Sequence, residues 1–317
     1  MATKIGLGSM NIRSSLPIAI ALVVDDICSL PEKLVNEYQI EIVKTKLYFP
    51  EWEKFPEKNL YQVMRETKAG PKTSAPSPGD YLKAYKKTLE KFEKVLVVTL
   101  SSKLSATYSS ARQAKELMPD PSKIFIFDSL SAATPEGLLT FKAAQLIREG
   151  KDIEEILKIL EELREKIKFF GFLETTYWVE KIGRMSHWQA TAFKILKGFG
   201  VQPMLGIKKG KVALTGFNFW TKDTFKALFH QFASVARREM KVNSEGGKLH
   251  RSEHEAKKVK KLQIGINYTD NIDLAYKLKE KVEKELEGEV VFISPVPPIV
   301  GANSGPGTLI AGCLPTV

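Results

Sequence analysis

The sequence has few cysteines and no long apolar run. Two cysteines, Cys28 and Cys313, occur among 317 residues, and so widely separated a pair neither forms a zinc site alone nor resembles a disulfide framework. The longest clean apolar run, residues 16–24, is about half of the ~20 residues that cross a bilayer. Charged residues on both sides and the lack of a small-residue cleavage site favour a buried strand over a secretory signal. We therefore expect a cytoplasmic protein without a membrane span, with reduced thiols and no metal site.

Standard catalytic motifs are also missing. The sequence contains no G-x-x-x-x-G-K-[ST] phosphate loop, no G-x-G-x-x-G fingerprint and no G-x-S-x-G nucleophile elbow. The four histidines are His187, His230, His250 and His254. His250 and His254 could share a helix face, but they lack the H-E-x-x-H order and lie in a charged segment, which favours solvated side chains. Asp25, Asp26 and Asp128 end apolar strands, where carboxylates also cap helices, so we assign no catalytic residue.

The net charge is +11, and part of the excess is concentrated in one segment. Residues 237–261 contain nine Lys and Arg against four Glu, and no aromatic residue occurs between Phe232 and Tyr268. A surface that binds nucleic acid usually interleaves aromatic and basic residues. The segment therefore favours a solvated helical hairpin over a nucleic-acid site. An acidic partner or phosphate groups are the alternative ligands.

Apolar β-branched runs alternate with helical periodicity along the chain. The expected strands are residues 18–24, 40–49, 94–100, 124–128, 169–173, 203–207, 211–214, 262–268 and 290–293, and the expected helices include 31–38, 59–68, 79–92, 105–117, 138–147 and 152–168. This alternation predicts an α/β protein, with a mostly parallel sheet flanked by helices in its N-terminal part. The strand pattern restarts after residue 167. We therefore expect a leader at 1–15, an N-terminal α/β domain at 16–167 and a C-terminal α/β domain at 168–317.

Two short Ser/Thr segments are candidates for an anion site. In the first, Thr73 and Ser74 precede Ser77 and Pro78, which look like an N-cap followed by proline at the first helical position. The second, residues 101–107, follows the strand 94–100 and leads into a helix near Ser105. The first turn of a helix offers unpaired amides, so a carboxylate would be stabilised there. Capping of the helix by Ser105 is the alternative explanation. A third segment, Gly301–Thr308, has three glycines and predicts a tight turn or a close backbone approach.

Together these motifs resemble the DegV family of fatty-acid-binding proteins, from about Ile18 to Leu314. The residues that carry the resemblance are 24–26, 30–31, 73–77, 100–108, 128–129, 182–186, 202–203 and 305–307. The resemblance implies two α/β domains of the EDD fold, with a long-chain fatty acid in a buried tunnel between them. It also implies a non-catalytic carrier without a cofactor, which in some bacteria presents the fatty acid to a separate fatty-acid kinase.

The resemblance assigns expected roles to individual positions. The carboxylate-binding residues would be Thr73, Ser74, Ser105, Ala106 and Thr107, with Thr73 and Ser105 as the main hydroxyl ligands. The cleft would include Arg184, Asn303, Ser304 and Gly305. The candidate acyl-chain lining is Leu104, Phe170, Phe172, Phe193, Ile195 and Leu196, although apolar residues of this kind are also ordinary core.

Three positions depart from the family pattern. Ala106 stands where glycine is usual, Asn303 replaces a histidine before the G-P-G turn, and residues 216–221 lack the usual basic K-x-R. The last two resemble positions implicated in kinase coupling. Two other functions remain open: an enzyme acting on a phosphorylated or carboxylated metabolite with Ser105 as nucleophile or phosphate ligand, or a lipid-sensing regulator that docks a partner through residues 237–261. A serine nucleophile needs an adjacent base, which the sequence does not supply.

Overall fold

The computed structural model describes residues 19–67, 70–218, 223–245, 262–286 and 288–315. The expected leader at 1–15 and residues 246–261 of the basic segment lie outside these ranges. Within them, no helix is long and apolar enough to cross a membrane. The first part of the chain contains β1 (Ile20–Asp25), η1 (Asp26–Cys28), α1 (Glu32–Glu37), β2 (Glu41–Val43), β3 (Lys46–Tyr48), α2 (Pro50–Glu53), α3 (Leu60–Thr67), β4 (Lys72–Ser74), α4 (Pro78–Leu89), β5 (Lys94–Thr99), α5 (Thr107–Glu116), η2 (Pro121–Lys123), β6 (Ile124–Asp128), α6 (Thr134–Arg148) and α7 (Ile153–Lys166). The second contains β7 (Lys168–Phe172), α8 (Tyr177–Lys181), α9 (His187–Gly198), β8 (Gln202–Lys208), β9 (Lys211–Asn218), α10 (Thr224–Glu245), β10 (Leu262–Tyr268), α11 (Ile272–Glu285), β11 (Gly288–Pro295), α12 (Pro298–Ser304) and β12 (Leu309–Pro315).

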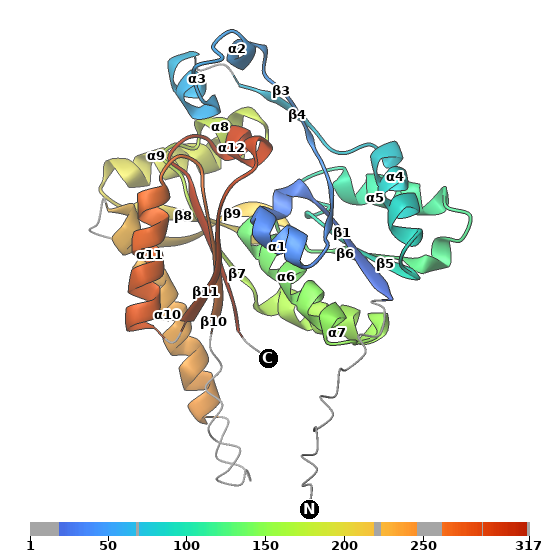
Figure 1. The fold of residues 1–317 in the computed structure, drawn as a ribbon. Coiled ribbons are helices and arrows are strands. Elements are labelled where there is room, and N and C mark those ends of the chain that lie inside the picture. The colour runs from blue at the N-terminus through green and yellow to red at the C-terminus, as the bar shows by residue number, and fades with distance from the viewer. Residues whose placement is uncertain (1–18, 68–69, 219–222, 246–261, 287, 316–317) are drawn as a thin grey trace, which may run out of the picture.

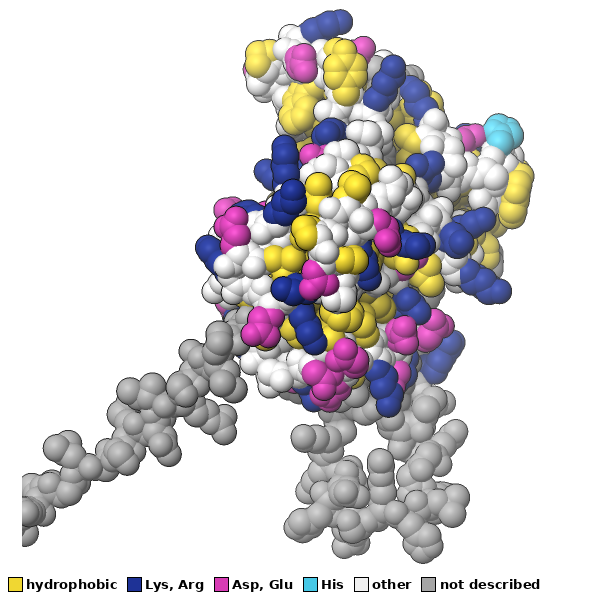
Figure 2. Space-filling model, turned by 90° about the vertical axis from the view of Figure 1, so that its right-hand side faces the viewer, with side chains coloured by type: hydrophobic (Ala, Val, Ile, Leu, Met, Phe, Trp, Pro, Cys, Tyr) yellow, Lys and Arg dark blue, Asp and Glu magenta, His cyan; other side chains and the backbone are white. Residues whose placement is uncertain are grey.

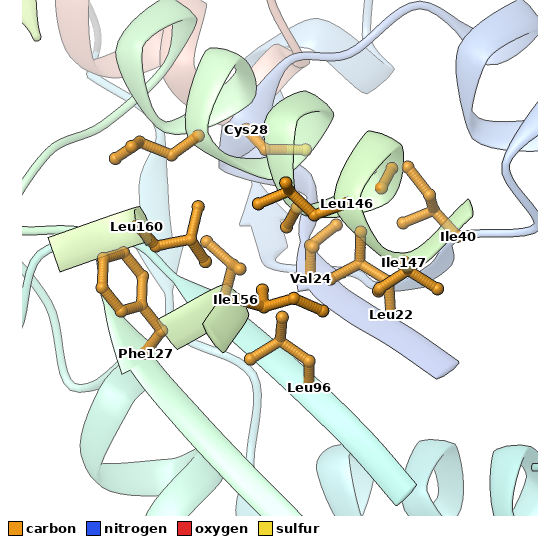
Figure 3. Packing of buried hydrophobic residues seen from close by; sticks show 14 of the residues in the cluster. Leu22, Val24, Cys28, Ile40, Leu96, Phe127, Leu146, Ile147, Ile156 and Leu160 are labelled. Atoms are coloured by element: carbon orange, nitrogen blue, oxygen red, sulfur yellow. The ribbon is translucent and has the colours of Figure 1, made fainter. Parts of the chain in front are cut away.

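The first sheet is parallel throughout, in the order β2-β1-β5-β6. Its strands are apolar on both faces because helices cover both. Ala21 and Val23 of β1 pack with α4 and α5, whereas Leu22 and Val24 point the other way and pack with α6 and α7. Figure 3 shows part of this second layer, where side chains of the helices meet those of β1 and β5. The expected parallel sheet flanked by helices is confirmed.

One expected strand is wrong in its extent. Residues 40–49 form two short strands in different sheets: β2 pairs with β1, and β3 pairs with β4 in a separate hairpin. The strand is interrupted between them at Thr45. The backbone N–H and the hydroxyl of Thr45 both donate to Asp26 Oδ1, at 3.0 and 2.8 Å. These bonds replace ladder bonds and redirect the chain towards the second sheet.

The second sheet has six strands in the order β11-β10-β12-β7-β8-β9 and is mostly antiparallel, with β10 and β11 as its parallel pair. Helices α10 and α11 pack together beside it (Figure 1). Strand β12 lies near the middle of this sheet and is buried from Leu309 to Leu314. This strand was not expected from the sequence, because its place depends on pairing with β10 and β7, which are far away in the chain. The expected boundary near residue 167 falls between α7 and β7, where the chain passes from the first sheet to the second.

Helix α6 connects the two parts. It packs on β1 of the first sheet and on β10 and β12 of the second, so most of its residues are buried. At its first residue, the Thr134 hydroxyl contacts Asn267 of β10 and the carbonyl oxygen of Ile310 in β12. Helices α2 and α3, although early in the chain, lie beside α8 and α12 (Figure 1), and residues of α3 share a buried cluster with Trp178. The two sheets are therefore held together on two sides.

Candidate functional site: a cavity between the two sheets

A cavity of about 200 Å³ lies at the carboxyl ends of β1 and β5. In this sheet β2 lies on one side of β1 and β5 lies on the other. The connections that leave β1 and β2 therefore run in opposite directions, and α/β proteins bind ligands at such a switch point. The second sheet forms the opposite wall. The described residues that line the cavity are Ile27, Thr45, Thr73, Ser74, Ala75, Leu100, Leu104, Ser105, Ala132, Ala133, Phe169, Gly171, Leu173, Val179, Ile182, Arg184, Leu205, Gly206, Ile207, Val212, Ile299, Val300, Asn303, Ser304 and Ile310.

Both predicted Ser/Thr segments reach this cavity. Thr73 and Ser74 belong to β4, which pairs with β3, and Ser105 lies in the loop between β5 and α5. The Ser105 hydroxyl lies 2.9 Å from that of Thr107 and accepts the Thr107 backbone N–H at 3.3 Å. If Thr107 donates between the hydroxyls, the Ser105 proton is free to donate to an anion. Thr107 thus supports Ser105 from a buried position without lining the cavity.

The two helix starts predicted near these segments have different outcomes. Ser77 forms a full capping box with Asp80 at the start of α4, with Pro78 in the first turn, so this expectation is confirmed. Helix α5 begins at Thr107, two residues after the expected start. Ala106 is exposed outside the cavity, with φ −75° and ψ −1°, a conformation open to any L-residue. The alanine that departs from the family pattern therefore causes neither crowding nor strain.

Three of the four predicted cleft residues line the cavity. Arg184 lines it and is the one charged residue among the described lining residues. Asn303 and Ser304 come from α12, and the Oδ1 atom of Asn303 and the hydroxyl of Ser304 are buried without a hydrogen-bond partner in the described structure. Gly305 is not in the lining. Its φ of 89° and the Trp178 ring, which would clash with a Cβ atom at this position, explain why glycine is needed there.

Most of the expected acyl-chain lining lies elsewhere. Leu104 does line the cavity. Phe170 and Phe172 face α10 instead, because side chains alternate along β7 and the other face of the strand carries Phe169, Gly171 and Leu173. Three expected residues come from α9, which packs behind the wall. Phe193 lies in a cluster with Leu173 and Val179, Ile195 is 55% exposed and Leu196 is partly buried outside the cavity.

The wall residues that were not expected from the sequence come from seven elements and the loops between them. They include Ile27 after β1, Leu100 after β5, Ala132 and Ala133 after β6, and Ile299 and Val300 on α12. Positions directly after parallel strands could have been inferred from the strand pattern. The residues of α12 and of β7 to β9 could not, because their placement depends on how the second sheet docks on the first.

Two buried carboxyl groups lie directly behind the wall. Asp25 accepts the backbone N–H of Leu100 at 2.9 Å and that of Ile27 at 3.1 Å, and it thereby fixes two loops that line the cavity. Burial raises the pKa of Asp25 to about 7. The Glu136 carboxyl faces Asp25, and burial, followed by the charge of Asp25, raises the pKa of Glu136 well above its usual value. Neither carboxyl oxygen of Glu136 has a hydrogen-bond partner in the described structure, and burial without a partner favours the neutral, protonated form of the group.

The lining contains no Asp, Glu, His, Lys or Cys among the described residues. His187 lies at the surface against Glu180, and His230 lies exposed on α10, so neither reaches Ser105. Such a site offers hydroxyls, amides, one guanidinium and a large apolar wall. The fold and the cavity together therefore define a two-part α/β protein with a preformed apolar pocket and few polar groups.

The sequence comparisons identify the family. The profile described as an uncharacterised protein of the DegV family matches residues 19–315, and the chain belongs to this family. It is 28% identical over 301 residues to a fatty acid-binding protein of Thermotoga maritima, covering 92% of this chain and 96% of that protein. It is 31% identical over 201 residues to a DegV domain-containing protein of Clostridium acetobutylicum, covering 62% of this chain and 70% of that one.

Solved structures agree on the fold. A DegV family protein from Thermus thermophilus, described with fatty acid binding, superposes with a TM-score of 0.76 at 24% identity, over 94% of this chain and 99% of that one. A DegV lipid binding protein from Thermotoga maritima gives a TM-score of 0.72 at 25% identity, over 93% and 98% of the two chains. The predicted family and α/β architecture are thereby confirmed.

Proposed function

We propose that this protein binds a long-chain fatty acid non-covalently in the cavity between its two sheets. The carboxylate would lie at Thr73, Ser74 and Ser105, and the acyl chain would run along the apolar wall. The observation that carries the proposal is the convergence of both Ser/Thr segments on one otherwise apolar cavity. The relatives described as fatty acid-binding proteins support it.

The chemistry of the lining fits an amphipathic anion. Hydroxyls can stabilise a carboxylate without a neighbouring Lys, and each buried methylene of the chain contributes about 0.8 kcal/mol. The acyl chain would therefore supply most of the affinity, and the Ser/Thr end would set its direction. A small, highly polar metabolite would gain little from these walls.

We propose binding without catalysis. The alternative enzyme would use Ser105 as a nucleophile, but no described lining residue can act as its base. In the described structure, the side chain that the Ser105 hydroxyl contacts is the Thr107 hydroxyl, which is not a base. We also propose a cytoplasmic location. Cys28 supports it, because this residue is a free thiol buried in the apolar cluster between the first sheet and α6 and α7.

The main test is the double variant Thr73→Val with Ser105→Ala, measured with a fluorescent fatty acid. We expect about a tenfold loss of affinity, because two charge-assisted hydrogen bonds are removed from the carboxylate. The matched control is Thr191→Val with Ser109→Ala, two exposed positions outside the cavity, which should bind like the parent. Equal affinity of the parent and the Thr73/Ser105 variant, both folded, would show that the carboxylate lies elsewhere.

Presentation to a fatty-acid kinase is a second and separate part of the proposal. Asn303 lies in the lining near the end of α12, with a buried amide oxygen available to a ligand. The test is acyl-phosphate formation when the loaded protein, a fatty-acid kinase and ATP are mixed, with an Asn303→His variant in parallel. Formation of acyl phosphate by either protein supports presentation, and its absence with both removes the kinase from the proposal while leaving the binding proposal intact.

A further inference from the structure

A second cleft lies on the other side of the cavity wall. It has a volume of about 680 Å³ and shares Phe169 and Ile207 with the cavity. One side is formed by the loops after β5 and β6 and by the end of α7, and the other by the β8–β9 turn and α10. The cleft therefore lies between the two parts of the chain, but it is separate from the proposed fatty-acid site.

The charges that line this cleft are almost all positive. Six are cations and one, Glu165, is a carboxylate. The cations are Lys103, Arg164, Lys168, Lys208, Lys209 and Arg238. None of the six forms an ion pair with a described carboxylate. By contrast, Figure 2 shows basic and acidic side chains mixed on the face that carries α4 and α5. Unpaired charges of one sign in a hollow raise the local concentration of the opposite charge.

Arg164 is held in place at this cleft. Its Nη1 donates to the carbonyl oxygen of Asp128 at 2.9 Å, and its guanidinium lies 5.1 Å from the centre of the Phe127 ring. Its Nε is buried and has no hydrogen-bond partner in the described structure. A guanidinium that is already ordered loses little entropy when it binds an anion, and its planar donors match phosphate oxygens.

The two walls are already joined, so the cleft is preformed. The Ser101 hydroxyl donates to the carbonyl oxygen of Gly210 at 2.7 Å and accepts the backbone N–H of Lys103 at 3.2 Å. Lys209 and Gly210 have φ of 51° and 79°, the geometry of a tight hairpin turn. The turn therefore presents Lys208 and Lys209 from a fixed position opposite the loop of Lys103.

We propose that this cleft binds a small ligand with linked phosphate groups, such as pyrophosphate or a nucleoside triphosphate. The cations come from both walls, so an anion with charge at several points contacts both, whereas a single carboxylate reaches one. An ordered guanidinium fits a phosphate oxygen better than a diffuse surface charge does. The site does not depend on a ligand in the cavity.

The test is calorimetric titration of the full chain with pyrophosphate and with ATP at about 150 mM salt, where distant surface charges are screened. We expect one saturable site per chain for at least one of the two ligands. Arg164→Gln should weaken binding about tenfold, which corresponds to the loss of one charge-assisted pair. Lys208→Gln with Lys209→Gln, at exposed positions on the turn, provides a second variant that does not disturb the Arg164 contacts.

The matched control is Lys83→Gln with Lys86→Gln on α4, two exposed lysines that form no ion pair with a described carboxylate and lie outside the cleft. It removes the same charge as the turn variant and should stay within about twofold of the parent. ATP binding more tightly than pyrophosphate would mean that the nucleoside also contacts the cleft. The proposal is overturned if the parent shows no saturable binding of either ligand, if the control loses as much affinity as the turn variant, or if both cleft variants bind like the parent.

Discussion

Replacing Glu136 by glutamine should change how stability depends on pH. Glutamine has nearly the same shape as protonated glutamic acid, so it can take the same position beside Asp25 behind the cavity wall. It cannot ionise. The substitution therefore keeps the packing of α6 and removes the titration of one fully buried carboxyl group.

The direction in which pH changes the free energy of unfolding follows from the raised pKa of Glu136, whose usual value is 4.5. The folded protein holds this proton above pH 4.5, where the unfolded chain releases it. Stability from this group is thus complete below pH 4.5 and is lost as the pH rises towards the folded pKa. The loss is roughly 1.4 kcal/mol per pH unit for one proton. Asp25, with a pKa raised to about 7, acts in the same direction between its usual value of 3.8 and pH 7.

We expect the free energy of unfolding of Glu136→Gln to fall less steeply between pH 5 and 7 than that of the parent, by about 1 kcal/mol per pH unit. Urea unfolding followed by tryptophan fluorescence at three pH values measures the slope. Glu161→Gln, an exposed carboxylate on α7, serves as the control for loss of surface charge. Identical slopes for the parent and Glu136→Gln would refute the buried, protonated state of this carboxyl group.

Three further predictions concern the surroundings of the cavity. Ser77→Ala removes the capping box of α4 and should lower the free energy of unfolding by about 1 kcal/mol, measured by urea unfolding; an unchanged midpoint would contradict the cap. Ala133→Gly should be stabilising by up to roughly 1 kcal/mol in the same assay, because φ is 52° at this non-glycine residue. Ala132→Gly at the neighbouring position is the control and should be destabilising. The opposite order would rule out strain at Ala133. Ala132→Phe places a ring in the cavity and should lower fatty-acid affinity about tenfold without loss of folding, and undiminished affinity would place the acyl chain elsewhere.

The parts of the fold that depend on local pattern could be predicted from the sequence. The apolar strands β1, β5 and β6 and the Ser77 cap all have short-range signals. Strand β12 and the division of residues 40–49 did not, because both depend on partners far away in the chain, such as β10 and Asp26.

The candidate site shows the same limit. Ser105 and Thr73 could be proposed because small polar residues at the ends of strands have a known use. Phe169 and Phe170 could not be told apart, since alternation along β7 shows that neighbours face opposite ways but not which way faces the cavity. The proximity of Asp25 and Glu136 was also hidden, because the two residues come together only when α6 packs on β1.

Native mass spectrometry of the full chain purified from cells tests the central claim most directly. A single bound molecule with the mass of a long-chain fatty acid, at lower occupancy in a folded Ala132→Phe variant, is the predicted result. A parent protein that is empty as purified and stays empty after incubation with long-chain fatty acids would contradict the proposed function.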